Sequence, residues 1–264
     1  MVNFSPLEAP VQNAKLLPVM HPGRPVGRDD LLKDVYLHLK NNRSVLLYGQ
    51  SGTGKTALAA ALANAYTGQT GGVLWFNVDN NTMAELVIRI GRAYQVDEIT
   101  GSDVPAGMIG AAAATIAEHR PFIVLDGPLD EQVANEFIVK IAGNLPVLLV
   151  QDEEEPAEGP WQAVEVGALV DTDAVVLFKQ KAAIKDDSSD IDIYGIVKLL
   201  QYRPLPIVIA ARAMVAGKKS ASDYFKVLQQ LVQSGKEPEE AAITASFMAL
   251  TGALQGIVLM MGAI

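Results

Sequence analysis

The stretch SVLLYGQSGTGKTALAAAL, from Ser44 to Leu62, decides the fold. It begins with a short apolar run of the kind that forms a buried strand, and it ends in an alanine- and leucine-rich run typical of a helix. Between the two, GQSGTGKT (Gly49–Thr56) matches the whole pattern G-x-x-x-x-G-K-[ST]. A strand, a glycine-rich loop and a helix in this order predict a P-loop, the loop that cradles phosphate groups.

The residue types of this loop suit phosphate binding. Its glycines let the backbone curl so that several N–H groups face one anion, and the following helix adds the positive end of its dipole. Lys55 is expected to reach the β- and γ-phosphates, and the Thr56 hydroxyl to bind Mg²⁺. The predicted nucleotide contacts in the loop are Gly49, Gln50, Ser51, Gly52, Thr53, Gly54, Lys55, Thr56 and Ala57.

A second strand supplies the other predicted magnesium ligand. In PFIVLDGPLDE (Pro121–Glu131), four apolar residues lead into Asp126. Ligands of α/β proteins bind at the carboxyl ends of the strands, so we expect Asp126 to lie beside the P-loop. Thr56 and Asp126 are therefore the predicted metal ligands, and Lys55 and Asp126 the candidate catalytic residues.

The rest of the first two thirds of the chain alternates strands and helices. GGVLWFNVD (71–79), PVLLV (146–150) and WQAVEV (161–166) are further apolar runs, with segments of helical periodicity between them. This alternation predicts an α/β fold with a parallel sheet flanked by helices. After about Gly167 the helical segments follow one another with no strand between, which predicts a separate helical domain.

Composition excludes several classes of function. The 264-residue chain has a net charge of −9 and a sequence pI of about 4.9, so it is a poor candidate for binding nucleic acid. It has no cysteine, which excludes disulfides, thiol catalysis and zinc–cysteine sites. No signal peptide precedes residue 25, so a cytoplasmic protein is the default expectation.

One segment leaves a membrane alternative open. Residues 241–264 carry no charge and are long enough to span a bilayer. Polar residues interrupt the run, and no Lys or Arg flanks it as an interfacial anchor. These features favour helices of a globular domain over a membrane segment.

Taken in order, the motifs resemble the STAND class of P-loop NTPases, and within it the NB-ARC ATPases of apoptosis and plant-immunity proteins. Besides the P-loop and the Asp126 strand, the matching segments are PVGRDD (25–30), PVLLVQDEE (146–154), VEVGALVDTDAVVLF (164–178), RPLPIVIAA (203–211) and AITASFMALTGALQGIVLMM (242–261). The resemblance implies an extended lead-in (1–25), a P-loop nucleotide-binding domain (26–167), a helical domain (168–235) and the start of a winged-helix domain (236–264).

The resemblance also implies the ligand. It predicts ADP or ATP with Mg²⁺, an adenine nucleotide whose base and ribose side is lined by Val26, Gly27 and Arg28. Pro206 is predicted to pack against the adenine. Two simpler interpretations stay open, since Pro206 also suits the first turn of a helix and Arg28 also suits a solvated helix end.

The chain departs from the family pattern in two places. Gly127 follows Asp126 where the family often has a second acid, and in many P-loop ATPases that acid prepares the attacking water. The segment 151–155 is Gln-Asp-Glu-Glu-Glu where an arginine that senses the γ-phosphate is usual. We expect this run to be a solvated acidic loop that repels a γ-phosphate, and Asp130 to begin the next helix.

Two functions follow as hypotheses. The first is an ADP/ATP-binding molecular switch of a signalling NTPase with slow or absent hydrolysis, which forms a nucleotide-dependent homo-oligomer in a full-length protein. The second is an active ATPase or phosphotransferase, which requires a base and a cation at the γ-phosphate. The candidates for those two roles are Glu131, Asp152 or Glu153 as base and Arg120, Arg203 or Arg212 as cation.

Overall fold

The computed structural model describes residues 24–66, 71–96, 99 and 106–249 of the chain. They form two compact units. The first contains the chain up to Gln50 together with Lys55–Val166, and the second contains Ser51–Gly54 together with the chain from Gly167 onward. Most of the predicted lead-in, and residues 250–264 of the predicted winged-helix and membrane segments, lie outside the described residues.

The first unit is built on a parallel five-stranded sheet. Its strands are β1 (Ser44–Tyr48), β2 (Val73–Asn77), β3 (Phe122–Asp126), β4 (Val147–Val150) and β5 (Trp161–Glu165). The order across the sheet is β2-β3-β4-β1-β5, and every neighbouring pair is parallel. The α/β prediction is confirmed, and each strand forms where an apolar run predicted it.

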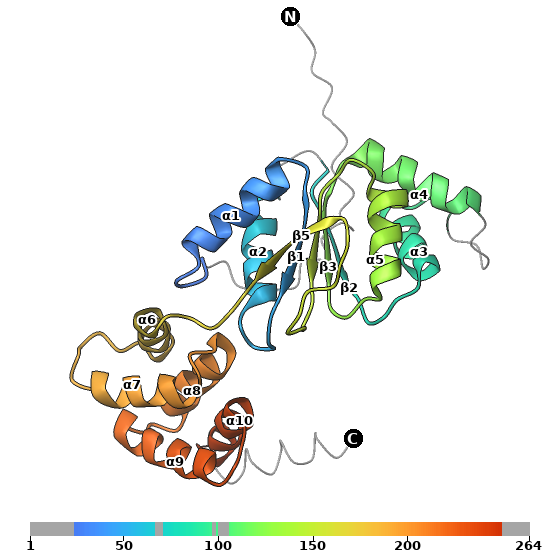
Figure 1. The fold of residues 1–264 in the computed structure, drawn as a ribbon. Coiled ribbons are helices and arrows are strands. Elements are labelled where there is room, and N and C mark those ends of the chain that lie inside the picture. The colour runs from blue at the N-terminus through green and yellow to red at the C-terminus, as the bar shows by residue number, and fades with distance from the viewer. Residues whose placement is uncertain (1–23, 67–70, 97–98, 100–105, 250–264) are drawn as a thin grey trace, which may run out of the picture. The chain divides into compact units, whose positions relative to one another are not determined.

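Helices cover both faces of this sheet (Figure 1). On one face lie α1 (Asp29–Lys40) and α2 (Lys55–Tyr66), and on the other lie α3 (Met83–Tyr94), α4 (Ala106–His119) and α5 (Glu131–Phe137). Successive strand side chains alternate between the two cores. Val45 and Leu47 of β1 pack with α1 and α2, whereas Leu46 packs with α3 and α5.

Helix α5 begins and ends in ways that the sequence only partly predicts. The Asp130 carboxylate accepts the backbone N–H groups of Gln132 at 2.9 Å and Val133 at 3.1 Å, which confirms that Asp130 begins this helix. The helical pattern of residues 130–143 predicts a single helix that continues to about Gly143. Instead the chain widens into the π-helical turn η3 (Ile138–Ala142), which closes with the Gly143 N–H donating to the Ile138 carbonyl at 2.9 Å.

The second unit is helical throughout its described part. Its helices are α6 (Asp171–Ala182), α7 (Asp190–Leu199), α8 (Pro204–Ala216), α9 (Ala221–Gln233) and α10 (Pro238–Ala249). Each forms where the sequence predicted a helix. Their packing buries a core of aliphatic and aromatic side chains, among them Phe178, Ile193, Ile207, Tyr224 and Ala241.

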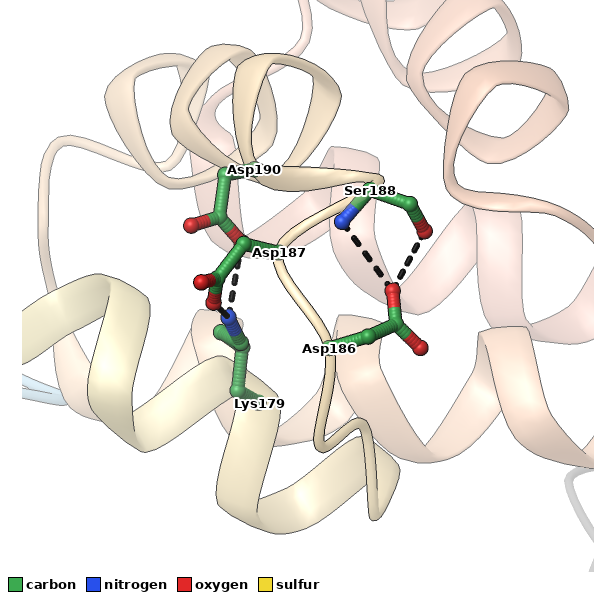
Figure 2. A network of polar contacts seen from close by, with 5 residues as sticks. All are labelled: Lys179, Asp186, Asp187, Ser188 and Asp190. Atoms are coloured by element: carbon green, nitrogen blue, oxygen red, sulfur yellow. Dashed lines mark hydrogen bonds and ion pairs between the residues drawn. The ribbon is translucent and has the colours of Figure 1, made fainter.

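A network of polar contacts shapes the turn between α6 and α7 (Figure 2). The Lys179 ammonium lies 2.7 Å from Asp187 and 2.8 Å from Asp190, and Asp186 accepts both the N–H and the hydroxyl of Ser188. The polar composition of residues 185–192 predicts a loop, but α7 already begins at Asp190. Acidic residues suit the first turn of a helix as well as a loop, since they face the positive end of its dipole.

Candidate functional site

The P-loop leaves the carboxyl end of β1 in a backbone conformation that requires glycine. The φ angles are +136° at Gly49, +78° at Gly52 and +96° at Gly54. A Cβ at Gly49 would lie 2.7 Å from the carbonyl oxygen of Val166. Helix α2 then begins at Lys55, so the loop meets the positive end of a helix dipole. This geometry fits a phosphate cradle, because glycines at positive φ let successive backbone N–H groups face one anion.

Lys55 is the buried cation of the site. Its side chain is only 3% exposed, and its ammonium has three acceptors. The Gly49 carbonyl lies at 2.6 Å, the Gln50 carbonyl at 2.7 Å and the Asp152 carboxylate at 2.6 Å. A buried ammonium needs such partners, because water no longer solvates its charge.

The two predicted metal ligands lie side by side. The Thr56 hydroxyl donates to the Asp126 carboxylate at 3.1 Å. Neighbouring oxygen ligands of an octahedral Mg²⁺ lie about 3 Å apart, so the pair fits this ion, which commonly takes one or two protein ligands and completes its shell with phosphate oxygens and water. Burial raises the pKa of the Asp126 carboxyl; the Thr56 hydrogen bond lowers it, and the charge of Asp152 raises it.

Gly127 has no room for a side chain. Its φ is +126°, and a Cβ built on it would lie 2.1 Å from the carbonyl oxygen of Val78. Its N–H donates to the Val150 carbonyl at 2.9 Å, which fixes the turn. An acidic residue cannot stand after Asp126 without a shift of the β2 and β3 ends.

Three residues of the acidic segment 152–155 contact the P-loop, and the sequence did not reveal that one of them pairs with the lysine. As expected, the four residues of the segment are exposed. Asp152 nevertheless pairs with Lys55, the Glu153 carbonyl accepts the Gly49 N–H at 2.8 Å, and the Gln50 side chain donates to Glu154 at 3.3 Å. One signal was available in the sequence. Asp152 lies two residues beyond the end of β4, the strand next to β3.

The remaining predicted site residues lie in two other places. Val26, Gly27 and Arg28 form the turn that enters α1, where the Arg28 carbonyl accepts the Leu32 N–H at 2.8 Å. Pro206 is buried in the first turn of α8. Their predicted contacts with the base and ribose stay predictions.

The second unit also holds the middle of the P-loop. Within it, the Leu205 N–H donates to the Gly52 carbonyl at 3.0 Å, and the Arg203 guanidinium donates to the Ser51 carbonyl at 3.3 Å. A Cβ on Gly52 would lie 3.3 Å from Leu205 and 3.5 Å from Pro206. The simpler interpretation of Pro206, a proline in the first turn of a helix, is consistent with its position.

Among the described residues, no helix is both long enough and apolar enough to pass through a bilayer. The chain is 23% identical over 222 residues to an ATP-dependent lipid A-core flippase of Francisella tularensis. That match covers 81% of this chain and 35% of the flippase, so the chain spans about a third of the length of these curated relatives.

Solved structures share the fold. A STAND protein with a tetratricopeptide repeat sensor from Pyrococcus horikoshii matches with a TM-score of 0.53 at 13% identity, over 90% of this chain and 41% of that one. Cdc6p from Pyrobaculum aerophilum matches with a TM-score of 0.56 at 16% identity, over 89% of this chain and 70% of that one. At such identities the likeness shows the P-loop NTPase fold.

A family model described as the AAA ATPase domain matches residues 24–245. The match includes the phosphate loop, both predicted metal ligands and the helices of the second unit up to α10. Because it spans well over half of the 264 residues, the chain belongs to the AAA ATPase domain family and is a nucleotide-binding P-loop domain.

Proposed function

We propose that this chain is the ADP/ATP-binding switch module of a cytoplasmic signalling ATPase of the STAND class, of the NB-ARC type, with slow or absent hydrolysis. The phosphate loop supports nucleotide binding, because its glycine geometry and its buried lysine are complete. The fold shared with a STAND protein is consistent with the class. The order of the NB-ARC-like segments along the chain supports the finer type.

Gly127 is the observation that carries the proposal of slow hydrolysis. The position after the magnesium-binding aspartate is closed to any side chain by the Val78 carbonyl. In addition, an acidic segment stands where an arginine would stabilise charge at the γ-phosphate, and such an arginine contributes about 10³–10⁵ in rate. A site that lacks both groups retains the means to hold a nucleotide without the means to cleave it quickly.

Different residues of the chain would bind the phosphates, the Mg²⁺ ion and the base. The P-loop backbone and Lys55 hold the phosphates, and Thr56 and Asp126 hold Mg²⁺, which neutralises phosphate charge when bound. The proposal places the base against Val26–Arg28 and Pro206. ADP would then favour a closed arrangement of the two units and ATP a looser one, to the extent that the two nucleotides differ in affinity for the two states.

The test is to purify the protein, denature it and identify the nucleotide released, and then to measure turnover of ATP. We expect bound ADP and a turnover well below one per minute. Lys55→Ala should lose nucleotide binding, because it removes the buried ammonium that would meet the phosphates; Lys40→Ala, an exposed lysine at the end of α1, is the matched control. A turnover on the order of 1 s⁻¹, the ordinary range of enzymes, would refute the switch.

An active ATPase or phosphotransferase is the second candidate function. The contact of Arg203 with the Ser51 carbonyl favours it, because this guanidinium is a cation held at the P-loop. It also requires a base, for which Glu131 in the first turn of α5, Asp152 and Glu153 are the candidates. The same turnover measurement distinguishes the two functions.

A further inference from the structure

The geometry points to Asp152 as a specificity-determining residue that competes with the terminal phosphate for Lys55 and so favours a nucleoside diphosphate over a triphosphate. The inference rests on the proposed nucleotide binding at the P-loop.

The hydrogen-bonding capacity of Lys55 is the first step. An ammonium has three N–H donors. In this structure they meet three acceptors, the carbonyls of Gly49 and Gln50 and the carboxylate of Asp152. The two carbonyls belong to the loop backbone and move only with it. An arriving phosphate oxygen can therefore bind the ammonium most readily by displacing Asp152.

Asp152 is held in place by its neighbours in the chain. Before it, the Gln151 N–H donates to the Leu47 carbonyl at 3.0 Å, and the buried Gln151 side chain donates to the Leu129 carbonyl at 3.0 Å. After it, the Glu153 carbonyl accepts the Gly49 N–H. These hydrogen bonds fix the backbone on both sides of residue 152. The fold therefore places the Asp152 carboxylate at Lys55, unlike a surface acid on a free loop.

The side chain itself can still leave. It is 64% exposed, in contrast to the 3% of Lys55, so its carboxylate can turn into water at small cost. Asp152 therefore acts as an exchangeable partner of a fixed cation. It keeps the buried ammonium neutralised in the nucleotide-free chain and competes with whatever anion arrives.

The charge of the nucleotide determines how much this competition lowers its affinity. The loop backbone supplies N–H groups to the inner phosphates, whereas the lysine reaches the β- and γ-phosphates. A triphosphate therefore brings one more charged group toward the lysine and its two neighbouring carboxylates, Asp152 and Asp126. Like charges a few ångströms apart repel even near a protein surface, although solvent screens an exposed group. The repulsion falls mainly on the γ-phosphate.

The test is to measure the dissociation constants of ADP and of a non-hydrolysable ATP analogue by calorimetry, with Mg²⁺, for the wild type and Asp152→Asn. The amide keeps the shape and the acceptor oxygen but removes the charge. We expect the variant to bind the ATP analogue about tenfold more tightly and ADP less than about threefold more tightly. Glu155→Gln removes the same charge three residues along the segment and should leave the ratio of the two constants unchanged.

The outcomes separate this inference from the function on which it rests. If the wild type binds neither nucleotide, both are overturned. If it binds them and Asp152→Asn leaves the ratio of the two dissociation constants unchanged, or if Glu155→Gln changes it equally, this inference alone is overturned.

Discussion

The pKa of Asp126, a predicted metal ligand, is subject to opposing effects of burial and of its neighbours. Its carboxylate is partly withdrawn from water at the end of β3, and burial raises its pKa above the ordinary value of 3.8. The neighbouring Thr56 hydroxyl offsets part of this effect, and Asp152 adds to it. The surroundings of Asp126 therefore disfavour its negative charge, and a bound cation would relieve that cost.

This balance predicts a pH dependence of stability. Because the folded pKa of Asp126 is raised, the folded chain binds its proton more tightly than the unfolded chain, and the free energy of unfolding falls as pH rises from about 4 through the folded pKa. Asp126→Asn should therefore unfold at higher denaturant concentration than the wild type at pH 7 without Mg²⁺, with the gap closing toward pH 4. Chemical denaturation at both pH values measures it, and a gap that widens on acidification would contradict the assignment.

The residues of the P-loop could be predicted because their motif is local, whereas the pairing of Asp152 with Lys55 could not. Gly49–Thr56 lie within eight consecutive positions, so one pattern identifies all of them. Asp152 meets Lys55 only because β4 lies between β3 and β1 in the sheet. The sequence contains no local sign of that order, so the acidic segment was predicted only to repel a γ-phosphate.

At the scale of elements, strand positions could be predicted and strand order could not. Each strand is an apolar run bounded by glycine, proline or polar residues, a local signal of a buried strand. Its neighbour is decided by packing over long distances in sequence; β1, for example, pairs with β4 and β5. The π-helical turn after α5 also escaped prediction, because five residues are too few to change a helical periodicity.

Asp130, at the start of α5, tests whether an acid of this region stabilises the fold or takes part in nucleotide binding. Asp130→Ala removes the carboxylate that accepts two N–H groups, and we expect a loss of about 1 kcal/mol in the free energy of unfolding. Asp130→Asn keeps an acceptor oxygen and should recover most of it. Urea denaturation measures the change in stability. Nucleotide affinity should stay the same in both variants, and a fall in affinity would mean that Asp130 belongs to the binding site.

At the scale of the whole molecule, the switch proposal predicts that the two units respond to the nucleotide. The chain has no cysteine, so two introduced cysteines carry spin labels without interference. Val139 of the first unit and Ile191 of the second are 63% and 90% exposed, so labels there disturb little. We expect the distance distribution between the labels to be narrower with ADP than with a non-hydrolysable ATP analogue. Identical distributions with the two nucleotides would count against the switch.

The order of strands in the sheet has a consequence for protein synthesis. Strand β1 carries the P-loop, yet its neighbour β4 contributes Val147, whose N–H meets the Ser44 hydroxyl across 103 residues of chain. A ribosome adds about 5–20 residues per second, so β1 waits on the order of 5–20 s for that neighbour to be made. During this time the backbone N–H and C=O groups along its edges have no native partner. The nucleotide cradle is therefore completed only after β4 and β5 have both emerged from the ribosome.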